Sequence, residues 1–168
     1  MFGKGNETQK RKERKQERIK AKAQKKPKKP KVSKHACHPD DHIEELAVKN
    51  FQKFCRLRDA YNGGYCISCG KYLVWNDNCD GGHYIKRKNK TVKFDEDNCH
   101  AQCVSCNKWK SGNDAEYRKN LIKKIGLEKV EYLESQKGVL LKEPRKRFHF
   151  IALNEYYLKK CRDIMKGK

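Results

Sequence analysis

The segment HAQCVSCNKWKSGN (residues 100–113) contains a Cys-x-x-Cys pair, and YCISCGKYL (residues 65–73) contains a second pair with the same spacing. Each pair can reach one tetrahedral ion from a single tight turn, and four thiolates complete a structural Zn²⁺ site. Reduced structural cysteines and a redox pair are the alternatives, but no thioredoxin-like βαβ pattern surrounds either pair. The predicted zinc ligands are Cys66, Cys69, Cys103 and Cys106.

The 33 residues between the two pairs are more than a small zinc ribbon needs. They comprise Gly70, KYLVW (71–75), a turn NDN (76–78), CDGGHYI (79–85), a basic loop KRKNK (86–90) and TVKF (91–94), followed by residues 95–102. This order indicates a β-hairpin and then a return strand, after which the second knuckle opens a helix. That is the treble-clef arrangement, in which zinc replaces the hydrophobic core that about 50 residues cannot supply. We therefore predict an α+β fold with a small zinc-bound core at residues 65–113.

Apolar residues recur at helical spacing on both sides of this core. Residues 41–61 are predicted to form an amphipathic packing helix, and residues 114–168 are predicted to form the C-terminal helices. Cys55 and Cys161 fall within these helices and are expected to be core thiols. The C-terminal helices are AEYRKNLIKKI before Gly126, LEKVEYLES, and FHFIALNEYYLKKCRDIMK, with VLLKE as a loop or short strand before the last.

Basic residues dominate the composition, with 42 Lys and Arg against 21 Asp and Glu and a formal net charge of +21. Residues 1–34 hold 15 Lys and Arg against three Glu and almost no large apolar side chains. Residues 1–40 are therefore predicted to be a basic N-terminal arm, disordered or partly helical, before a folded domain at 41–168. Both parts are basic, which favours nucleic acid as partner, because neutralising phosphates releases counterions. A membrane surface is the competing partner for a polybasic segment.

The nine cysteines are an odd number, and the N-terminus lacks a secretory signal pattern. Both observations argue against a disulfide framework and for a reducing compartment. No apolar run approaches the ~20 residues that span a bilayer. A cytoplasmic protein with no membrane partner is expected.

Histidine and asparagine side chains recur beside the predicted zinc site. His83 ends the predicted hairpin, Asn98 precedes the second cysteine pair, and Asn107 directly follows that pair. The pattern resembles the HNH, or ββα-metal, endonuclease superfamily, with Asn107 in the place where many members have the last His. In addition, DGGH (80–83) resembles the Asp-x-Gly-His motif of the non-specific nuclease branch.

Four segments further resemble the NinG/Rap family of phage recombination endonucleases: CISCG, DGGHY, FDEDNCHAQCVSCNKWKSGN and YRKNLIKKIG. The similarity runs from roughly residue 43 to the C-terminus. It implies a structure-specific DNA endonuclease of the bacterial host cytoplasm that acts on branched recombination intermediates, D-loops and Holliday junctions, alongside other phage recombination proteins. A homodimer is expected on a four-way junction, because symmetrical cutting needs two active sites, and the last helix is the expected interface.

The superfamily resemblance also implies roles for particular side chains. His83 would be the general base that takes a proton from water, and Asn98 would bond the hairpin backbone and hold the ring. A catalytic Mg²⁺ or Mn²⁺ would lie at the scissile phosphate, with the oxygens of Asn107 and Asp80 as candidate ligands. Many members have a ligand directly before the base, where this sequence has Gly82. Asp80 then needs a bulge to help, because positions three apart on a strand face opposite sides.

Three further features of the core are less specific. His100 shares a strand face with Asn98 and is either a second contact to metal or phosphate, or a packing histidine beside the knuckle. The glycines at 81 and 82 are expected to let a DNA backbone approach closely. No role is predicted for Cys79 and Cys99.

Basic and aromatic residues surround the predicted cleft. Their interleaving favours phosphate contacts that position DNA without reading its sequence, and a solvated charged surface is the alternative. The predicted DNA-binding residues are Lys86, Arg87, Lys88, Lys90, Lys108, Trp109 and Lys110, with Tyr84 as a further aromatic face.

Two other functions fit the same composition: a non-catalytic zinc-finger DNA-binding protein and an RNA-binding zinc module. The spare polar residues at His83, Asn98 and Asn107 favour the nuclease, because a structural knuckle needs only its four cysteines. The stretch HACHPDDH is interpreted as a solvated linker and not a second metal site, because its spacing matches no common zinc template. Its metal-type residues are His35, Cys37, His38 and His42.

Overall fold

The chain divides into two units, Met1–Ala36 and Cys37–Lys168. A computed structural model describes residues 39–167, all of which lie in the second unit. The predicted basic arm therefore lies outside the described residues, apart from its last two positions. Three groups of buried side chains hold the described part together. One lies around two long helices, one around the cysteines and one beneath two shorter helices.

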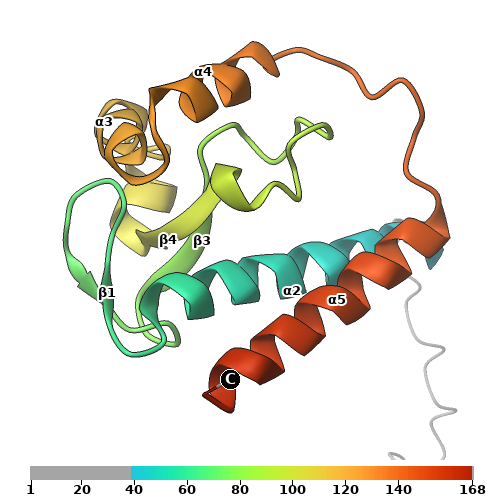
Figure 1. Ribbon diagram of the computed structural model, residues 1–168, viewed down its shortest axis with the longest axis horizontal. Coiled ribbons are helices and arrows are strands. Elements are labelled where there is room, and N and C mark those ends of the chain that lie inside the picture. Colours follow the sequence, from blue (N-terminus) through green and yellow to red (C-terminus); the bar gives the residue numbers. More distant parts are fainter. Residues whose placement is uncertain (1–38, 168) are drawn as a thin grey trace, which may run out of the picture. The chain divides into compact units, whose positions relative to one another are not determined.

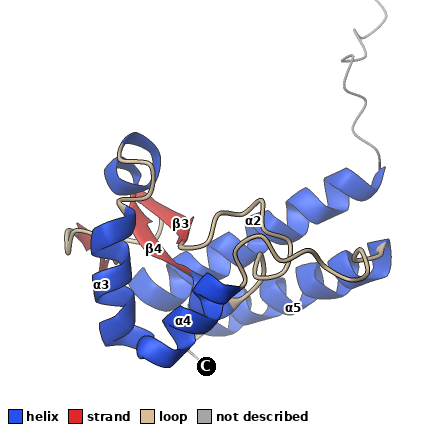
Figure 2. Cartoon of the chain, turned by 90° about the horizontal axis from the view of Figure 1, so that it is seen from above, coloured by secondary structure: helices blue, strands red, loops and turns tan. Residues whose placement is uncertain are grey.

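Two long helices, α2 (Pro39–Ala60) and α5 (Arg147–Met165), lie side by side in both Figure 1 and Figure 2. Their apolar faces meet, with the rings of Phe51 and Tyr157 centred 5.0 Å apart. Burying such aromatic side chains supplies much of the stability of a small domain. α2 begins two residues before its predicted start, and α5 agrees with its prediction within one residue. The predicted core thiols of Cys55 and Cys161 are buried in this interface.

A two-stranded antiparallel hairpin lies between α2 and the shorter helices (Figure 2). It consists of β3 (Cys79–His83) and β4 (Cys99–Cys103), and Gly81 lies opposite Ala101 in a register without a break. β3 packs close to α2: a Cβ added at Gly81 would come within 2.9 Å of a backbone oxygen of the helix. Glycine is therefore needed there for packing. The expected close approach of a DNA backbone at Gly81 and Gly82 stays a prediction.

The predicted return strand at residues 91–94 is wrong, because these residues form bends and turns in the loop between β3 and β4. The strand that returns beside β3 is β4, which carries Cys103. Val92 and Phe94 are both buried, so their alternation reflects packing against the core without a strand ladder. A buried side-chain amide, that of Asn98, donates to the Val92 carbonyl at 2.9 Å in place of a strand partner.

The first knuckle is flanked by a second small sheet, and the second knuckle leads into short helices. Strands β1 (Gly64–Tyr65) and β2 (Tyr72–Leu73) pair antiparallel across the first knuckle. The remaining elements are η1 (Glu96–Asn98), η2 (Ser105–Trp109, one π-helical turn), α3 (Asp114–Ile125) and α4 (Leu127–Ser135). The mixture of helices with small sheets agrees with the predicted α+β class.

Helices α3 and α4 join at Gly126, whose φ of +89° only glycine adopts without strain. This confirms the predicted end of α3 and the start of α4. The segment VLLKE between α4 and α5 is a loop. Within residues 39–167, none of the helices has the length and hydrophobicity required to cross a bilayer.

Candidate active site and metal centre

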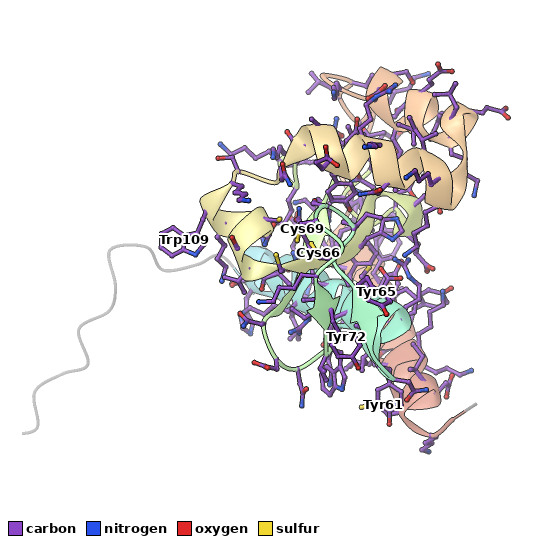
Figure 3. The ribbon with its side chains drawn as sticks, turned by 90° about the vertical axis from the view of Figure 1, so that its left-hand side faces the viewer. Tyr61, Tyr65, Cys66, Cys69, Tyr72 and Trp109 are labelled. Atoms are coloured by element: carbon purple, nitrogen blue, oxygen red, sulfur yellow. The ribbon has the colours of Figure 1, made fainter. Side chains whose placement is uncertain are left out.

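The four predicted zinc ligands come together. The sulfurs of Cys66, Cys69, Cys103 and Cys106 all lie within 4.8 Å of one another, and those of Cys69 and Cys103 are 3.8 Å apart. Four sulfurs at the usual Zn–S distance of about 2.3 Å form a tetrahedron with edges of roughly 3.8 Å. The cluster therefore has the size that a structural zinc ion needs. Figure 3 shows the first pair beside the β1–β2 sheet.

The local backbone positions the four sulfurs to bind a cation. The N–H groups of Cys103 and Cys106 point at the sulfurs of Cys66 and Cys103, at 3.3 and 3.4 Å. Gly70 takes a φ of +70°, which closes the first turn. Burial raises the pKa of Cys106 to about 12 in the absence of a cation, whereas a bound metal ion favours the thiolate. The donor set and spacing fit a structural metal such as zinc.

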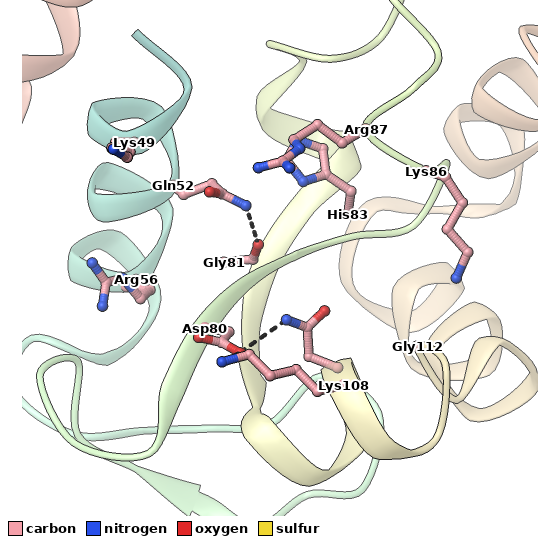
Figure 4. Close-up of a pocket in the computed structure, with 11 residues that line it drawn as sticks. Lys49, Gln52, Arg56, Asp80, Gly81, His83, Lys86, Arg87, Lys108 and Gly112 are labelled. Atoms are coloured by element: carbon pink, nitrogen blue, oxygen red, sulfur yellow. Dashed lines mark hydrogen bonds and ion pairs between the residues drawn. The ribbon is translucent and has the colours of Figure 1, made fainter. Parts of the chain in front are cut away.

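A polar pocket of about 520 Å³ opens beside His83 (Figure 4). Helix α2 forms one wall, β3 and the start of the following loop form the floor, and η2 forms the opposite wall. Six predicted site residues line it: Asp80, His83, Lys86, Arg87, Asn107 and Lys108. These six positions, which the sequence predicts as site residues, lie up to 28 residues apart in the chain and come together in one pocket.

His83 has a defined tautomer in this pocket. Its Nε2 lies 2.9 Å from the carbonyl oxygen of Lys93. Because a carbonyl can only accept, Nε2 carries the ring proton and Nδ1 keeps a free lone pair. Burial, with the nearby charges of Arg87 and Lys93, lowers the pKa of His83 from 6.5 to about 4. The ring is therefore neutral at pH 7 and able to accept a proton.

Lys93 is itself held from α2. Its ammonium group pairs with the Glu44 carboxylate at 2.5 Å, and both side chains are largely buried. The ring of Phe51 packs against the ring of His83 with centroids 5.7 Å apart. Helix α2 therefore fixes both the hydrogen-bond partner and one face of the imidazole.

Asn98 is completely buried, and its side chain hydrogen-bonds to the backbone of the loop between His83 and Lys93. Its Oδ1 accepts from the Ile85 N–H at 2.7 Å, and its Nδ2 donates to the carbonyls of Ile85 and Val92 at 3.1 and 2.9 Å. These bonds tie together the two ends of the segment that leads from His83 to Lys93. Asn98 thus makes the backbone contacts that were expected of it.

The side chains of Asp80 and Asn107 contact each other on the face of β3 opposite His83. The Asn107 amide donates to the Asp80 carboxylate at 2.9 Å, and the Lys108 ammonium lies 3.6 Å from the same oxygen. Strand β3 has no bulge, so Asp80 and His83 lie on opposite faces, as their spacing requires. Both nevertheless line the pocket.

His100 does not line this pocket. It is buried, with Nδ1 2.8 Å from the Arg58 guanidinium and 3.2 Å from Asp59, and Nε2 3.1 Å from the Asp97 carbonyl. Burial lowers the pKa of His100. Burial alone would raise the pKa of Asp59, but its contacts with His100 and Arg58 hold it well below its usual range. These contacts agree with the packing alternative, and they replace the expected metal contact.

The other predicted DNA-binding residues lie around the pocket without lining it. Trp109 is 82% exposed at the end of η2, where its ring points away from the helix (Figure 3). Lys88 and Lys90 line a separate hollow, and Lys110 is exposed. Tyr84 is the exception, because it is buried and its hydroxyl donates to Glu134. It therefore offers no free aromatic face, contrary to the prediction.

Helix α2 adds a polar wall that the sequence analysis missed. Lys49, Gln52 and Arg56 line the pocket, and the Gln52 amide donates to the Gly81 carbonyl at 3.0 Å (Figure 4). The three positions share the face opposite the apolar stripe of the helix. That spacing is visible in the sequence, but only the fold shows that this face borders a site.

Of the residues that the structure describes, the remaining cysteines of the predicted core and the remaining histidine of the predicted linker do not line the pocket. Cys79 packs in the core beside the zinc-type cysteines, and Cys99 is fully buried against α2. Both are therefore core residues. His42 is exposed on α2, whereas His35, Cys37 and His38 lie outside the described residues.

Comparisons with known proteins agree with these motifs. The model of the family described as "Bacteriophage Lambda NinG protein" matches residues 1–167. The chain is 39% identical over 105 residues to Protein ninG of Escherichia phage 933W, and 38% identical to Protein ninG of Salmonella phage P22 and of Escherichia phage lambda. Each alignment covers 62% of this chain and 50% of the relative, so the chain spans about half the length of these curated relatives. No solved structure matches it.

Proposed function

The chain belongs to the bacteriophage lambda NinG family, and from that premise we propose that it is a metal-dependent, structure-specific DNA endonuclease acting on branched recombination intermediates. The observation that carries the proposal is the state of His83: a neutral imidazole, with Nε2 bonded to a carbonyl and Nδ1 free, in a pocket lined by cations. A structural zinc protein does not require such a group.

The pocket supports hydrolysis of a phosphodiester bond. His83 Nδ1 takes a proton from the attacking water, and the Lys93 carbonyl stabilises the resulting imidazolium by accepting from Nε2. Lys86, Arg87 and Lys108 contribute positive charge around the phosphate. Asn98 positions the loop that carries Lys93 and does not itself touch the substrate.

The residues opposite His83 fit a hard divalent cation. Asp80 offers a carboxylate and Asn107 a side-chain carbonyl, the oxygen ligands that Mg²⁺ and Mn²⁺ prefer. Among the described residues, the four cysteines are the only group of three or more His, Cys, Asp or Glu side chains arranged to hold a metal. Substrate phosphates would therefore complete the ligand set. When bound, the cation would polarise the scissile phosphate and stabilise the leaving 3′-oxygen.

We assign the core to the HNH, or ββα-metal, branch of treble-clef folds. The order of β3, β4 and the helical turn η2, with the second cysteine pair at the junction of β4 and η2, supports this assignment. Cys103 and Cys106 would hold a zinc ion that joins β4 to η2, and η2 carries Asn107 to its contact with Asp80. The same metal-supported core would hold His83 and Asn107 on opposite sides of one phosphate.

Symmetrical cutting of a four-way junction needs two active sites. We propose a homodimer on four-way junctions, in the cytoplasm of the bacterial host and alongside other phage recombination proteins. Helix α5 supports the dimer, because it carries exposed apolar side chains at Phe148, Ile151, Leu158 and Met165. Light scattering that shows one copy of the chain, both free and on a junction, would contradict the dimer.

A non-catalytic zinc protein that binds DNA or RNA is the second candidate. The basic composition favours a binding protein as much as a nuclease. A binding protein, however, has no use for the free Nδ1 of His83. A cleavage panel separates the two: linear duplex, flap, D-loop, four-way junction and an RNA hairpin, each with Mg²⁺ or Mn²⁺. The nuclease cuts the branched DNAs first. Tight binding of branched DNA without any cut, under either cation, would favour the binding protein.

A further inference from the structure

The connection between α4 and α5 presents apolar side chains to solvent. The segment GVLL (residues 138–141), here called the apolar loop, lies within this connection. Leu140 is 86% exposed and Val139 is 44% exposed. The fold makes no use of the Leu140 side chain, so its exposure requires another explanation.

The apolar loop forms one wall of a hollow of about 540 Å³. Pro144 extends this wall, and residues 88–90 form the other one. Those residues belong to the loop that begins at His83 and ends at Lys93. The hollow is therefore apolar on one side and basic on the other.

Hydrogen bonds tie the apolar loop to the loop of His83. Thr91 donates to the Val139 carbonyl at 3.1 Å, and the Asn89 amide donates to the carbonyl of Gln136 at 2.5 Å. Arg145 reaches back to the Lys90 carbonyl at 2.5 Å. These bonds hold the backbone on both sides of Leu140 against the segment that positions the proposed base.

The charges around Leu140 indicate which molecule it meets. Lys88, Lys90, Lys137 and Lys142 are all exposed, and Glu143 is the one acidic side chain between positions 136 and 147. An apolar patch that docks another protein has no need of so many cations, whereas DNA brings phosphates and apolar base faces together.

We propose that Leu140 is a wedge that enters DNA at a branch point, and that the hollow between residues 88–90 and the apolar loop receives the base it displaces. Apolar wedges separate base steps in other DNA-bending proteins. Bases at a branch are already poorly stacked, so displacing them costs less there than in a duplex. The wedge rests on the proposed function and gives it a physical basis for preferring branched DNA.

The test is 2-aminopurine fluorescence, which rises when this base analogue leaves the stack. The probe is placed at the centre of a four-way junction or inside a linear duplex, and the full-length, zinc-loaded chain is added without Mg²⁺ or Mn²⁺. Wild type should raise the signal at the junction centre and not in the duplex. Leu140→Ala should abolish the rise and reduce the preference for junction over duplex by about tenfold.

Two further variants sharpen this test. Leu127→Ala makes the same change at an exposed leucine at the start of α4 and should behave as wild type. Leu140→Met keeps an apolar side chain and should retain the fluorescence rise. Circular dichroism confirms that each variant is folded.

A wild-type fluorescence rise and junction preference in Leu140→Ala would overturn the wedge. So would a change in oligomeric mass with unchanged fluorescence, since Leu140 would then contact a second copy of the chain. A Leu140-dependent rise in a protein that cuts no DNA with either cation would support the wedge while removing the proposed nuclease function.

Discussion

His83 differs from an ordinary buried histidine because it lines a polar pocket while one of its ring nitrogens is bonded to a carbonyl. The bond to Lys93 selects the tautomer, and Phe51 holds the ring plane. Local sequence could single out this histidine by its position after two glycines. It could not show the tautomer, because that depends on a carbonyl ten residues later and on α2.

The pH dependence of cleavage follows from this environment. Since the pKa of His83 is lowered from 6.5 to about 4, the neutral form that serves as base persists as the pH falls from 8 to 5. Below pH 4 the protonated form dominates, and kcat/KM should fall about tenfold per pH unit, because this ratio reports the free enzyme. NMR titration of the His83 ring gives the same midpoint independently. A midpoint near 6.5 in both measurements would contradict the burial argument.

Asn98 should be important for stability as well as for position. Asn98→Ala leaves the Ile85 N–H and the Val92 carbonyl buried without their partner, which should lower the free energy of unfolding by about 3 kcal/mol. Urea denaturation measures the change. Asn62→Ala, at an exposed asparagine, is the control and should change stability by less than about 0.5 kcal/mol. Equal effects of the two substitutions would show that the Asn98 network is dispensable.

At the scale of elements, sequence patterns located the helices better than the strands. Amphipathic periodicity gave α2 and α5 within two residues, because one apolar face decides where such a helix packs. The return strand was misplaced, because alternating buried residues at 91–94 resemble a strand even when no neighbour pairs with them. The predicted hairpin between 71–75 and 79–85 was also wrong, because β2 pairs with β1 and β3 pairs with β4. The Arg58–Asp59–His100 contact joins residues about 40 positions apart, which no local pattern reveals.

The four-cysteine cluster should determine whether the hairpin and η2 stay together. Cys103→Ala removes a sulfur at the end of β4, so bound zinc should fall from about one equivalent to none and the melting temperature should drop. Metal analysis and thermal denaturation measure the two effects. Cys79→Ala is the control, since Cys79 is buried beside the cluster but outside it, and it should keep its zinc. Loss of zinc from both variants would show that the ligand set is wrong.

For the whole molecule, charge and pocket together define the expected substrate. The net charge of +21 attracts any nucleic acid, so charge alone would not separate a nuclease from a binding protein. The polar face of α2 supplies part of the pocket wall, although sequence analysis interpreted this helix only as packing. Its apolar stripe predicts what it buries, but the pattern says nothing about what its polar face borders.

Affinity for DNA should depend on salt in proportion to the phosphates that the pocket contacts. Arg56→Ala removes one lining cation and should reduce the slope of log K against log salt by about 0.9. Lys159→Ala, an exposed substitution on α5 outside the pocket lining, should leave the slope unchanged. Fluorescence anisotropy at several salt concentrations measures both. Identical slopes for wild type and Arg56→Ala would place the DNA elsewhere on the surface.

The proposed general base is tested most directly by single-turnover cleavage of a four-way junction with Mn²⁺, comparing wild type with His83→Ala. His42→Ala, at an exposed histidine on α2, is the matched control. His83→Ala should cut about 10³-fold more slowly, while junction affinity and zinc content stay unchanged and His42→Ala cuts as wild type. Cleavage by His83→Ala at the wild-type rate would show that His83 is not the general base.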